Sequence, residues 1–368
     1  MNLTRRHFTG MAALCAASPL VAGSQQDPEE DSGRRVGYCI VALGRISMQH
    51  FMPATRLSKY SRVTAIVSGH RDKAEKWAAD YGVPARSIYN YENYDAIAEN
   101  HDIDAVYIAL PTGMHAEYTI RAAKAGKHVL CEKPMATKVA DAQAMVDACR
   151  KAGKKLMIAY RCQLEPTNLR AIQMIREGRL GKLQAIESAN GFNIKPEWRL
   201  TQSLGGGGPL MDVGIYSLNA CRYLTGEEPG PEPAVRAYAS VIDHDGRFNE
   251  VEENLSWTMH FPSGVVASCN TTYGCSMPGF YRVHGSKGWL HMEPAFGYEG
   301  QRLKAQIQGE PVIDELSPAK DPSHFVAEAD HFADCIMRNR DPKTPGEEGV
   351  RDMKLMSAIY ESAGRKPL

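Results

Sequence analysis

Short apolar runs alternate with amphipathic segments between residues 35 and 160. Runs without any charged residue occur at 36–43, 63–67, 105–110, 129–131 and 156–159. Runs of this kind are typical of parallel strands that are buried on both faces. The segments between them fit helices, which we expect from about 47 onward and at 72–81, 115–125 and 138–152. This alternation predicts a doubly wound parallel α/β sheet over residues 35–160.

The pattern changes after residue 160. Residues 254–261 alternate between apolar positions, such as Leu255 and Trp257, and polar ones, such as Ser256. Period-two alternation indicates a sheet with one buried face and one polar face. We expect strand 183–188, strands 265–273 and 280–292 as an antiparallel meander, and helices at 166–177, 209–224, 325–337 and 346–362. Residues 161–368 are therefore predicted to form an α+β domain with an open, predominantly antiparallel sheet.

The first residues carry the features of an export signal. Arg5 and Arg6 precede Phe8, a mild apolar run at 11–22 and small residues at 22–24. The apolar run is too short to remain in a bilayer as a spanning helix. We interpret residues 1–24 as a twin-arginine signal peptide, which predicts a periplasmic protein, and residues 25–34 as a polar N-terminal arm.

Charge and cysteine content exclude several classes of function. Lys and Arg total 43, and so do Asp and Glu, which leaves no broad basic field for nucleic acid or for a membrane surface after export. The nine cysteines are scattered and form no Cys-x-x-Cys pair. They are expected to be buried thiols, and no metal site is predicted.

The turn after the first strand predicts a dinucleotide site. Leu43, Gly44, Arg45 and Ile46 occupy the place of the Gly-x-Gly-x-x-Gly fingerprint, in which backbone N–H groups approach a pyrophosphate. Only one glycine of that pattern remains. The turn nevertheless lies between a strand and a helix, as the Rossmann site requires.

The end of the second strand indicates which dinucleotide binds. NAD sites usually carry an acid there for the ribose hydroxyls, but this chain has Ser68, Gly69, Arg71 and Lys73 and no acid at the strand end. A hydroxyl and two cations suit a 2′-phosphate, so the pattern favours NADP over NAD.

Two further segments are typical of the oxidation of a sugar hydroxyl, in which the O–H group loses a proton and the C1–H bond supplies the hydride. Glu132 and Lys133 lie at the carboxyl end of a parallel strand, and Asp212 and Tyr216 lie four residues apart on one helix face. Tyr216 is a useful base only if its pKa falls, which a nearby ammonium such as that of Lys133 would achieve. Asp212 is suited to hold sugar hydroxyls and to orient Lys133.

These residues resemble the glucose–fructose oxidoreductase/inositol dehydrogenase/MocA family, and within it the glucose–fructose oxidoreductases most closely. The Glu-Lys-Pro motif at 132–134 marks the family, while 212–216 and 160–162 narrow the resemblance to this branch. Matching stretches run over almost the whole chain after the signal, at 35–41, 67–69, 104–108, 125–129, 131–137, 155–162, 198–200, 205–216 and 345–349.

The resemblance implies a role for each matching position. Lys133 would be the catalytic lysine beside the nicotinamide, and Asp212 and Tyr216 the active-site acid and the proton-transferring tyrosine. Ser68 and Lys73 would hold the 2′-phosphate. The positions that would line the cofactor or the sugar are Leu110, Pro111, His115, Glu132, Arg161, Trp198, Arg199 and Tyr298. The second domain would bind substrate, and its free sheet face would assemble a dimer or tetramer.

The expected activity follows from resemblance and export together. An exported enzyme finds no pool of soluble NADP, so NADP(H) is expected to stay tightly bound. An aldose, glucose or xylose, would be oxidised to its lactone, and a second sugar would then be reduced to an alditol. The two reactions would alternate in a ping-pong cycle. The chain departs from the fructose-reducing pattern at Ala42, Ser47, the short arm and residues 193–197. The second sugar is therefore expected to be either fructose or a second aldose. The alternatives are an aldose 1-dehydrogenase that releases NADPH, an NAD-dependent glycoside hydrolase and a non-catalytic sugar sensor.

Overall fold

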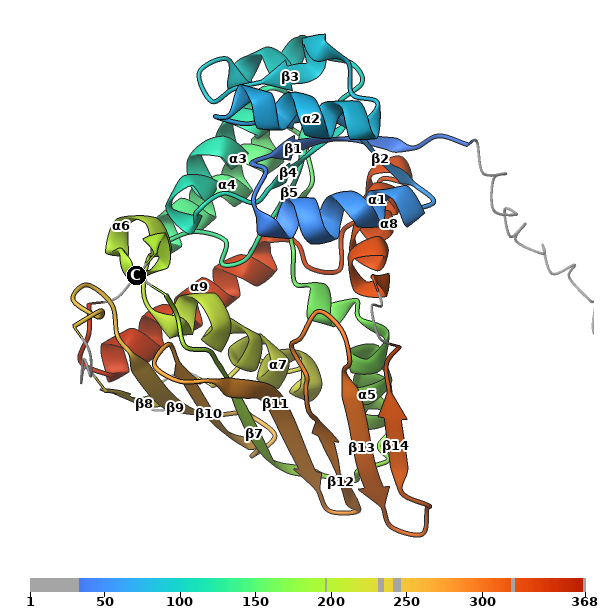
Figure 1. Cartoon of the computed structure of the whole chain (residues 1–368). Coiled ribbons are helices and arrows are strands. Elements are labelled where there is room, and N and C mark those ends of the chain that lie inside the picture. The colour runs from blue at the N-terminus through green and yellow to red at the C-terminus, as the bar shows by residue number, and fades with distance from the viewer. Residues whose placement is uncertain (1–32, 196, 231–234, 241–245, 319–321, 367–368) are drawn as a thin grey trace, which may run out of the picture. The chain divides into compact units, whose positions relative to one another are not determined.

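The computed structural model describes residues 33–195, 197–230, 235–240, 246–318 and 322–366, with only the backbone given for 235–240. The expected signal peptide and residues 25–32 of the expected arm lie outside these ranges. The unit that begins at Arg35 contains two sheets, each with its own helices (Figure 1). Within the described ranges, no helix is long and apolar enough to cross a membrane.

The first sheet is parallel throughout, with the strand order β3-β2-β1-β4-β5-β6. Its strands are β1 (Val36–Val41), β2 (Ser61–Val67), β3 (Ile88–Tyr89), β4 (Ala105–Ile108), β5 (His128–Cys131) and β6 (Leu156–Ile158). Its helices are α1 (Met52–Leu57), α2 (Arg71–Tyr81), α3 (His115–Lys124) and α4 (Val139–Lys151), and a π-helical turn, Ser47–Phe51, precedes α1. The prediction of a doubly wound sheet is confirmed.

Alternate residues of β1 explain why its apolar run is continuous. Tyr38 and Ile40 belong to a core that contains residues of α1 and α2, whereas Cys39 and Val41 belong to a second core with residues of α3 and α4. All six residues of β1 are buried, because helices cover both faces of the sheet.

The second sheet is mixed and mostly antiparallel, with the order β14-β13-β12-β11-β7-β10-β9-β8. Its strands are β7 (Leu183–Gly191), β8 (Val235–Ser240), β9 (Asn254–His260), β10 (Val266–Thr272), β11 (Met277–Gly285), β12 (Gly288–Met292), β13 (Arg302–Ile307) and β14 (Ile313–Leu316). Helices α5 (Pro166–Arg176) and α7 (Ile215–Thr225) pack against the face of this sheet that is turned toward the first sheet, and the short helix α6 (Gln202–Gly205) lies between the two sheets (Figure 1).

The expected meander is wrong in two respects. Strand β7 lies between β10 and β11, parallel to β10, so these two strands are not neighbours. The expected strand 280–292 is two strands, β11 and β12, joined through the paired Gly285 and Gly288. Alternation of apolar residues shows which face of a strand is buried, but it carries no information about which strand lies beside it.

The two last helices return to the first sheet. Helix α8 (Ser323–Met337) packs against α1, β1 and β2, and α9 (Gly346–Ser362) packs against α4, α7 and β6. The segment before α9 is tied to β6, because Ile158 N donates to Thr344 O at 2.9 Å and Thr344 Oγ1 donates to Ile158 O at 2.7 Å. The carboxyl-terminal part of the chain therefore contributes to the packing of both sheets.

Seven of the eight described cysteines are buried, as expected, and Cys275 is exposed. The sulfur atoms of Cys221 and Cys269 lie 3.7 Å apart, and all eight described cysteines are free thiols.

The backbone at Ala42, directly after β1, adopts a conformation that normally requires glycine. Its φ angle is +80°, and its N–H donates to Val67 O at 3.0 Å. In this left-handed region a Cβ atom approaches the following carbonyl group, so alanine is strained where the usual fingerprint has glycine.

We expect Ala42→Gly to raise the free energy of unfolding by about 1 kcal/mol, because the gain from relieved strain exceeds the loss from a more flexible unfolded chain. Urea unfolding measures the change. The matched control is Ala109→Gly, at the end of β4, whose φ angle is not positive and which should lose about 0.5–1 kcal/mol. Equal losses in both variants would contradict the strain at Ala42.

Candidate active site

A cavity of about 770 Å³ opens at the carboxyl ends of β1, β4 and β5. In doubly wound sheets this edge is where ligands bind. The cavity also reaches the end of β7 and the start of α7, so the second sheet and its helix contribute to the walls as well. Its lining comprises Ala42, Gly44, Arg45, Ile46, Ala109, Leu110, Pro111, Thr112, His115, Glu132, Lys133, Pro134, Arg161, Asn190, Gly191, Phe192, Glu197, Trp198, Arg199, Asp212, Val213, Tyr216, Phe296, Gly297 and Tyr298.

The turn after β1 fits a dinucleotide. Gly44, Arg45 and Ile46 line the cavity, and the turn leads directly into a helical segment. A Cβ atom on Gly44 would find its nearest neighbour, Ala109 O, only at 3.9 Å, so a side chain there would project into open cavity space. The absence of that side chain leaves room for a pyrophosphate against the backbone.

Five predicted cofactor residues are not part of the cavity wall, namely Leu43, Ser68, Gly69, Arg71 and Lys73. Lys73 Nζ donates to Leu43 O at 2.6 Å and so joins α2 to the turn after β1. Ser68 Oγ accepts from His70 N at 3.1 Å within the turn after β2, and Gly69 lies against the ring of Tyr91. The remaining one, Arg71, is exposed and pairs with Glu75 at 2.7 Å.

His115 and Glu132 are held by neighbours in the first domain. The His115 ring nitrogens lie 2.9 Å from Pro134 O and 2.8 Å from Leu110 O, so the ring bridges the loops that follow β4 and β5. Burial lowers the pKa of His115. The Glu132 carboxylate accepts from Tyr107 Oη at 2.6 Å, and burial raises its pKa.

Asp212 is the acceptor on which three segments converge. Lys133 Nζ lies 2.7 Å from its main-chain oxygen and 3.5 Å from Oδ1, while Arg199 Nε and Tyr273 Oη lie 3.0 Å and 2.9 Å from Oδ2. Burial acts to raise the pKa of Asp212, but the charges of Lys133 and Arg199 outweigh it and hold the pKa below its ordinary value. Asp212 is therefore a carboxylate at neutral pH, and the predicted contact with Lys133 is present.

Tyr216 has a different cation at its hydroxyl from the one expected. Arg161 Nη2 donates to Tyr216 Oη at 3.3 Å, whereas Lys133 Nζ lies over the face of the ring, 4.5 Å from its centroid. Burial raises the pKa of Tyr216, and Arg161 is the main charge that acts to lower it. The expected ammonium of Lys133 thus lies over the ring and is turned toward Asp212, and the cation at the hydroxyl itself is Arg161.

Asp212 and Tyr216 share the cavity although the helix between them is irregular. Residues 210–214 form a π-helical turn, and α7 begins only at Ile215. Single π turns are frequent at functional sites, where they shift the direction of a side chain. The four-residue spacing nevertheless places both side chains in the cavity wall.

Arg161, Trp198, Arg199 and Tyr298 also line the cavity, as the resemblance implied. Sequence reasoning missed Thr112, Asn190, Phe192, Val213, Phe296 and Gly297 in the wall, and Tyr273 behind Asp212. Tyr273 follows β10 and carries no motif, so no signal in the sequence points to it. Glu197 lies in the divergent segment 193–197 that was expected to border the sugar, and it pairs with Arg199 at 2.6 Å. In the described ranges, no group of three or more His, Cys, Asp or Glu side chains is arranged to hold a metal ion.

Two family models match the chain. The oxidoreductase family with an NAD-binding Rossmann fold covers residues 36–160, and the GFO/IDH/MocA C-terminal domain covers residues 168–291. The fold and the cavity thus define a dinucleotide-binding oxidoreductase. The chain belongs to the glucose–fructose oxidoreductase/inositol dehydrogenase/MocA family, which confirms the resemblance seen in the sequence.

Several relatives carry sugar chemistry in their names. The chain is similar to a solved aldose–aldose oxidoreductase from Caulobacter crescentus in complex with glycerol, with 44% identity, a TM-score of 0.86 and coverage of 91% of this chain and 100% of that one. It is 31% identical to D-xylose 1-dehydrogenase [NADP(+)] of Haloarcula marismortui, over 89% of this chain and 91% of the relative. A second D-xylose 1-dehydrogenase (NADP(+)), from Haloferax volcanii, is 30% identical over 88% of this chain and 96% of the relative.

Asp212→Asn should lower the free energy of unfolding by about 1–3 kcal/mol at neutral pH, because two cations lose their charged partner. The wild-type pKa is depressed, so this stabilisation is present above the ordinary Asp pKa and is lost as the pH falls through the folded value. Urea unfolding of both proteins at neutral pH and at about pH 3.5 should show the difference shrinking on acidification.

The control for this measurement is Asp314→Asn. Asp314 is an exposed partner of Arg302, and its pKa is also lowered, first by the Arg302 hydrogen bond. Its loss should have a much smaller effect, because solvent screens surface pairs. A similar loss in both variants would show that burial does not strengthen the contacts of Asp212.

Proposed function

We propose that this protein is an exported sugar oxidoreductase with tightly bound NADP(H) that oxidises an aldose to its lactone and reduces a second sugar, an aldose or fructose, to an alditol. The observation that carries the proposal is the convergence of Lys133, Asp212 and Tyr216 on one cavity at the strand ends of a dinucleotide-binding sheet. The similarity to an aldose–aldose oxidoreductase favours an aldose as the second sugar.

The residues that would hold the cofactor are those of the turn after β1, Gly44, Arg45 and Ile46, with Leu110 and Pro111 after β4. A nicotinamide dinucleotide bound there would supply the acceptor and donor of hydride. Ser68, Arg71 and Lys73 would hold a 2′-phosphate, and the absence of an acid at the end of β2 supports NADP. The NADP-dependent names of two relatives support the same preference.

The proton moves through Tyr216 in this proposal. During oxidation its phenolate oxygen takes the proton of the sugar hydroxyl, and during reduction the phenol returns that proton to the new alkoxide oxygen. Arg161, which donates to Tyr216 Oη, stabilises the phenolate in surroundings that otherwise favour the neutral phenol. The Asp212 carboxylate, fixed by Lys133 and Arg199, accepts hydrogen bonds from sugar hydroxyls and orients the ring.

Location and assembly belong to the same proposal. The twin-arginine pattern at residues 4–9 supports export to the periplasm, where a retained cofactor would be an advantage. In the described ranges, the helices cover one face of the second sheet (Figure 1). Its other face carries a hollow lined by Ser256, Asn270 and Phe280, among others. This open face supports a homo-oligomer, a dimer or tetramer, formed through the second sheet.

One alternative has an observation in its favour. The two relatives named D-xylose 1-dehydrogenase support an aldose dehydrogenase that releases NADPH after each turnover. The two activities share the cavity and the proton path, and they differ in whether the nucleotide leaves.

Retention of the cofactor is tested on purified protein without added nucleotide. We expect about one NADP per chain to be released on denaturation, to be reduced when glucose or xylose is added to the intact protein, and to be reoxidised by a second sugar. Absorbance of the reduced nicotinamide follows both half-reactions. Protein that carries no nucleotide and turns over only with added NADP would contradict the closed cycle and favour the dehydrogenase.

The role of Tyr216 is tested with a matched pair of hydroxyl deletions. Tyr216→Phe should lower turnover by about 10²–10⁴-fold with nucleotide binding unchanged, because the proton acceptor is lost while the ring keeps its contacts. Tyr273→Phe removes a hydroxyl from Asp212 in the same site and should lower turnover by about tenfold. Wild-type turnover in Tyr216→Phe would refute the assignment of the base.

A further inference from the structure

Two side-chain contacts join the 3-10 turn Arg161–Gln163 to α7, one turn of helix apart. Arg161 Nη2 donates to Tyr216 Oη at 3.3 Å, and Gln163 Nε2 donates to Asn219 Oδ1 at 3.0 Å. Tyr216 and Asn219 are three residues apart and so lie on the same face of α7. The contact between Gln163 and Asn219 therefore joins the same two segments as the contact between Arg161 and Tyr216, but it lies outside the cavity wall.

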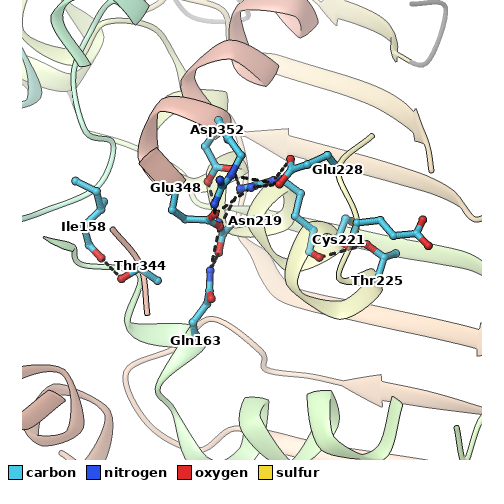
Figure 2. Close-up of polar contacts among 12 residues, drawn as sticks. Ile158, Gln163, Asn219, Cys221, Thr225, Glu228, Thr344, Glu348 and Asp352 are labelled. Atoms are coloured by element: carbon cyan, nitrogen blue, oxygen red, sulfur yellow. Dashed lines mark hydrogen bonds and ion pairs between the residues drawn. The ribbon is translucent and has the colours of Figure 1, made fainter. Parts of the chain in front are cut away.

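A carboxylate from α9 joins this second contact (Figure 2). Glu348 Oε1 accepts from Gln163 Nε2 at 3.3 Å, from Asn219 Nδ2 at 3.1 Å and from Arg222 Nη1 at 2.9 Å. Asn219 also donates to Asp352 Oδ2 at 2.9 Å, and Arg222 binds Asp352 as well. One buried acceptor thus fixes the 3-10 turn and α7 relative to the same point on α9.

The burial of these groups makes the arrangement stiff. The side chains of Arg222 and Asp352 are 3% and 0% exposed, and Gln163 and Asn219 are also buried. A buried polar group that loses its partner is costly, so each group is held where its hydrogen bonds are complete. Phe296 and Gly297 hold the Arg161 guanidinium through their main-chain oxygens, and the Phe296 ring lies 5.6 Å from that of Tyr216. The contact of Gln163 with Asn219 adds a direct hydrogen bond between the turn and α7.

We infer that Gln163, Asn219 and Glu348 are positioning residues that set the Arg161 guanidinium against the Tyr216 hydroxyl. The inference rests on the proposed role of Tyr216 as the proton carrier. If Gln163 loses its two acceptors, the turn keeps only the Arg161 hydrogen bond to α7, and we expect that 3.3 Å contact to lengthen. The charge that stabilises the phenolate then acts from further away.

The test variant is Gln163→Met, which keeps the length of the side chain and removes both donors. The control is Glu228→Gln, which weakens the network at its exposed end and leaves the Gln163 contacts intact. Glu228 is 52% exposed, and its carboxylate lies 2.6 Å from Arg222 Nη2. We expect Gln163→Met to lower kcat by about tenfold or more with KM for the sugar nearly unchanged. Glu228→Gln should leave both constants close to those of the wild type.

The pH profile separates positioning from general loss of structure. Loosening Arg161 should raise the pKa of the group that must be deprotonated, so the rising limb of kcat against pH should move up by about one unit in Gln163→Met and not in the control. The charged and titratable groups around Tyr216 are Glu132, Lys133, Arg161, Cys162 and Tyr298. A lower kcat with an unshifted profile would overturn the inference.

A spectroscopic measurement makes the test independent of turnover. In protein labelled with 13Cζ-tyrosine, the Tyr216 resonance is assigned by its loss in Tyr216→Phe, and its chemical shift at neutral pH reports the hydrogen bond to Arg161. This shift should change in Gln163→Met and stay in place in Glu228→Gln. If Gln163→Met does not fold, Gln163→Asn, which retracts the amide, serves instead. An unchanged resonance in the folded variant overturns the inference, whether or not the protein turns over sugar. If the resonance changes in the variant but the wild type turns over no sugar, only the proposed function is refuted.

Discussion

The buried carboxylate of Asp212 is the interaction on which the rest of the site depends. Its ligands come from the loop after β5, from the 3-10 turn Trp198–Leu200 and from the residue that follows β10, so one charge ties the edge of the first sheet to the second domain. A carboxylate in such surroundings is stable only while its cations and its hydroxyl donor are in place. The contact therefore sets both the ionisation of Asp212 and the distance across the cavity.

The ionisation of Tyr216 also depends on burial and on a nearby charge. Burial favours the neutral phenol of Tyr216, and the charge of the cation at its hydroxyl is the main influence that opposes this preference. Because Lys133 is engaged by Asp212, this cation is Arg161, which is itself held by main-chain oxygens of Phe296 and Gly297. Arg161 is thus the cation at the Tyr216 hydroxyl, while Lys133 contacts both catalytic candidates, Asp212 through its ion pair and Tyr216 through the ring face.

The candidate residues that sequence reasoning identified have one property in common: their chemical type and their place at a strand or helix end are both visible locally. Gly44 and Lys133 follow strands of a parallel sheet, and the ends of such strands meet at one edge. Asp212 and Tyr216 stand at a helical spacing. Tyr273, Asn190 and Phe296 contribute equally to the cavity and its support, yet they reach it through the pairing of distant strands, which no local pattern encodes.

By itself, the sequence determined the first sheet, the helices that cover it, the buried and polar faces of β9 and the presence of a dinucleotide turn. Each of these depends on the burial or backbone conformation of neighbouring residues, and such preferences act within a few positions of the chain. Only the tertiary structure decided that β7 lies between β10 and β11, that Ala42 takes a positive φ angle and that Arg161 is the cation at Tyr216. These outcomes depend on contacts between segments far apart in the chain, where the cost of burying a charge or an unpaired group selects among partners that are equally compatible with the local pattern.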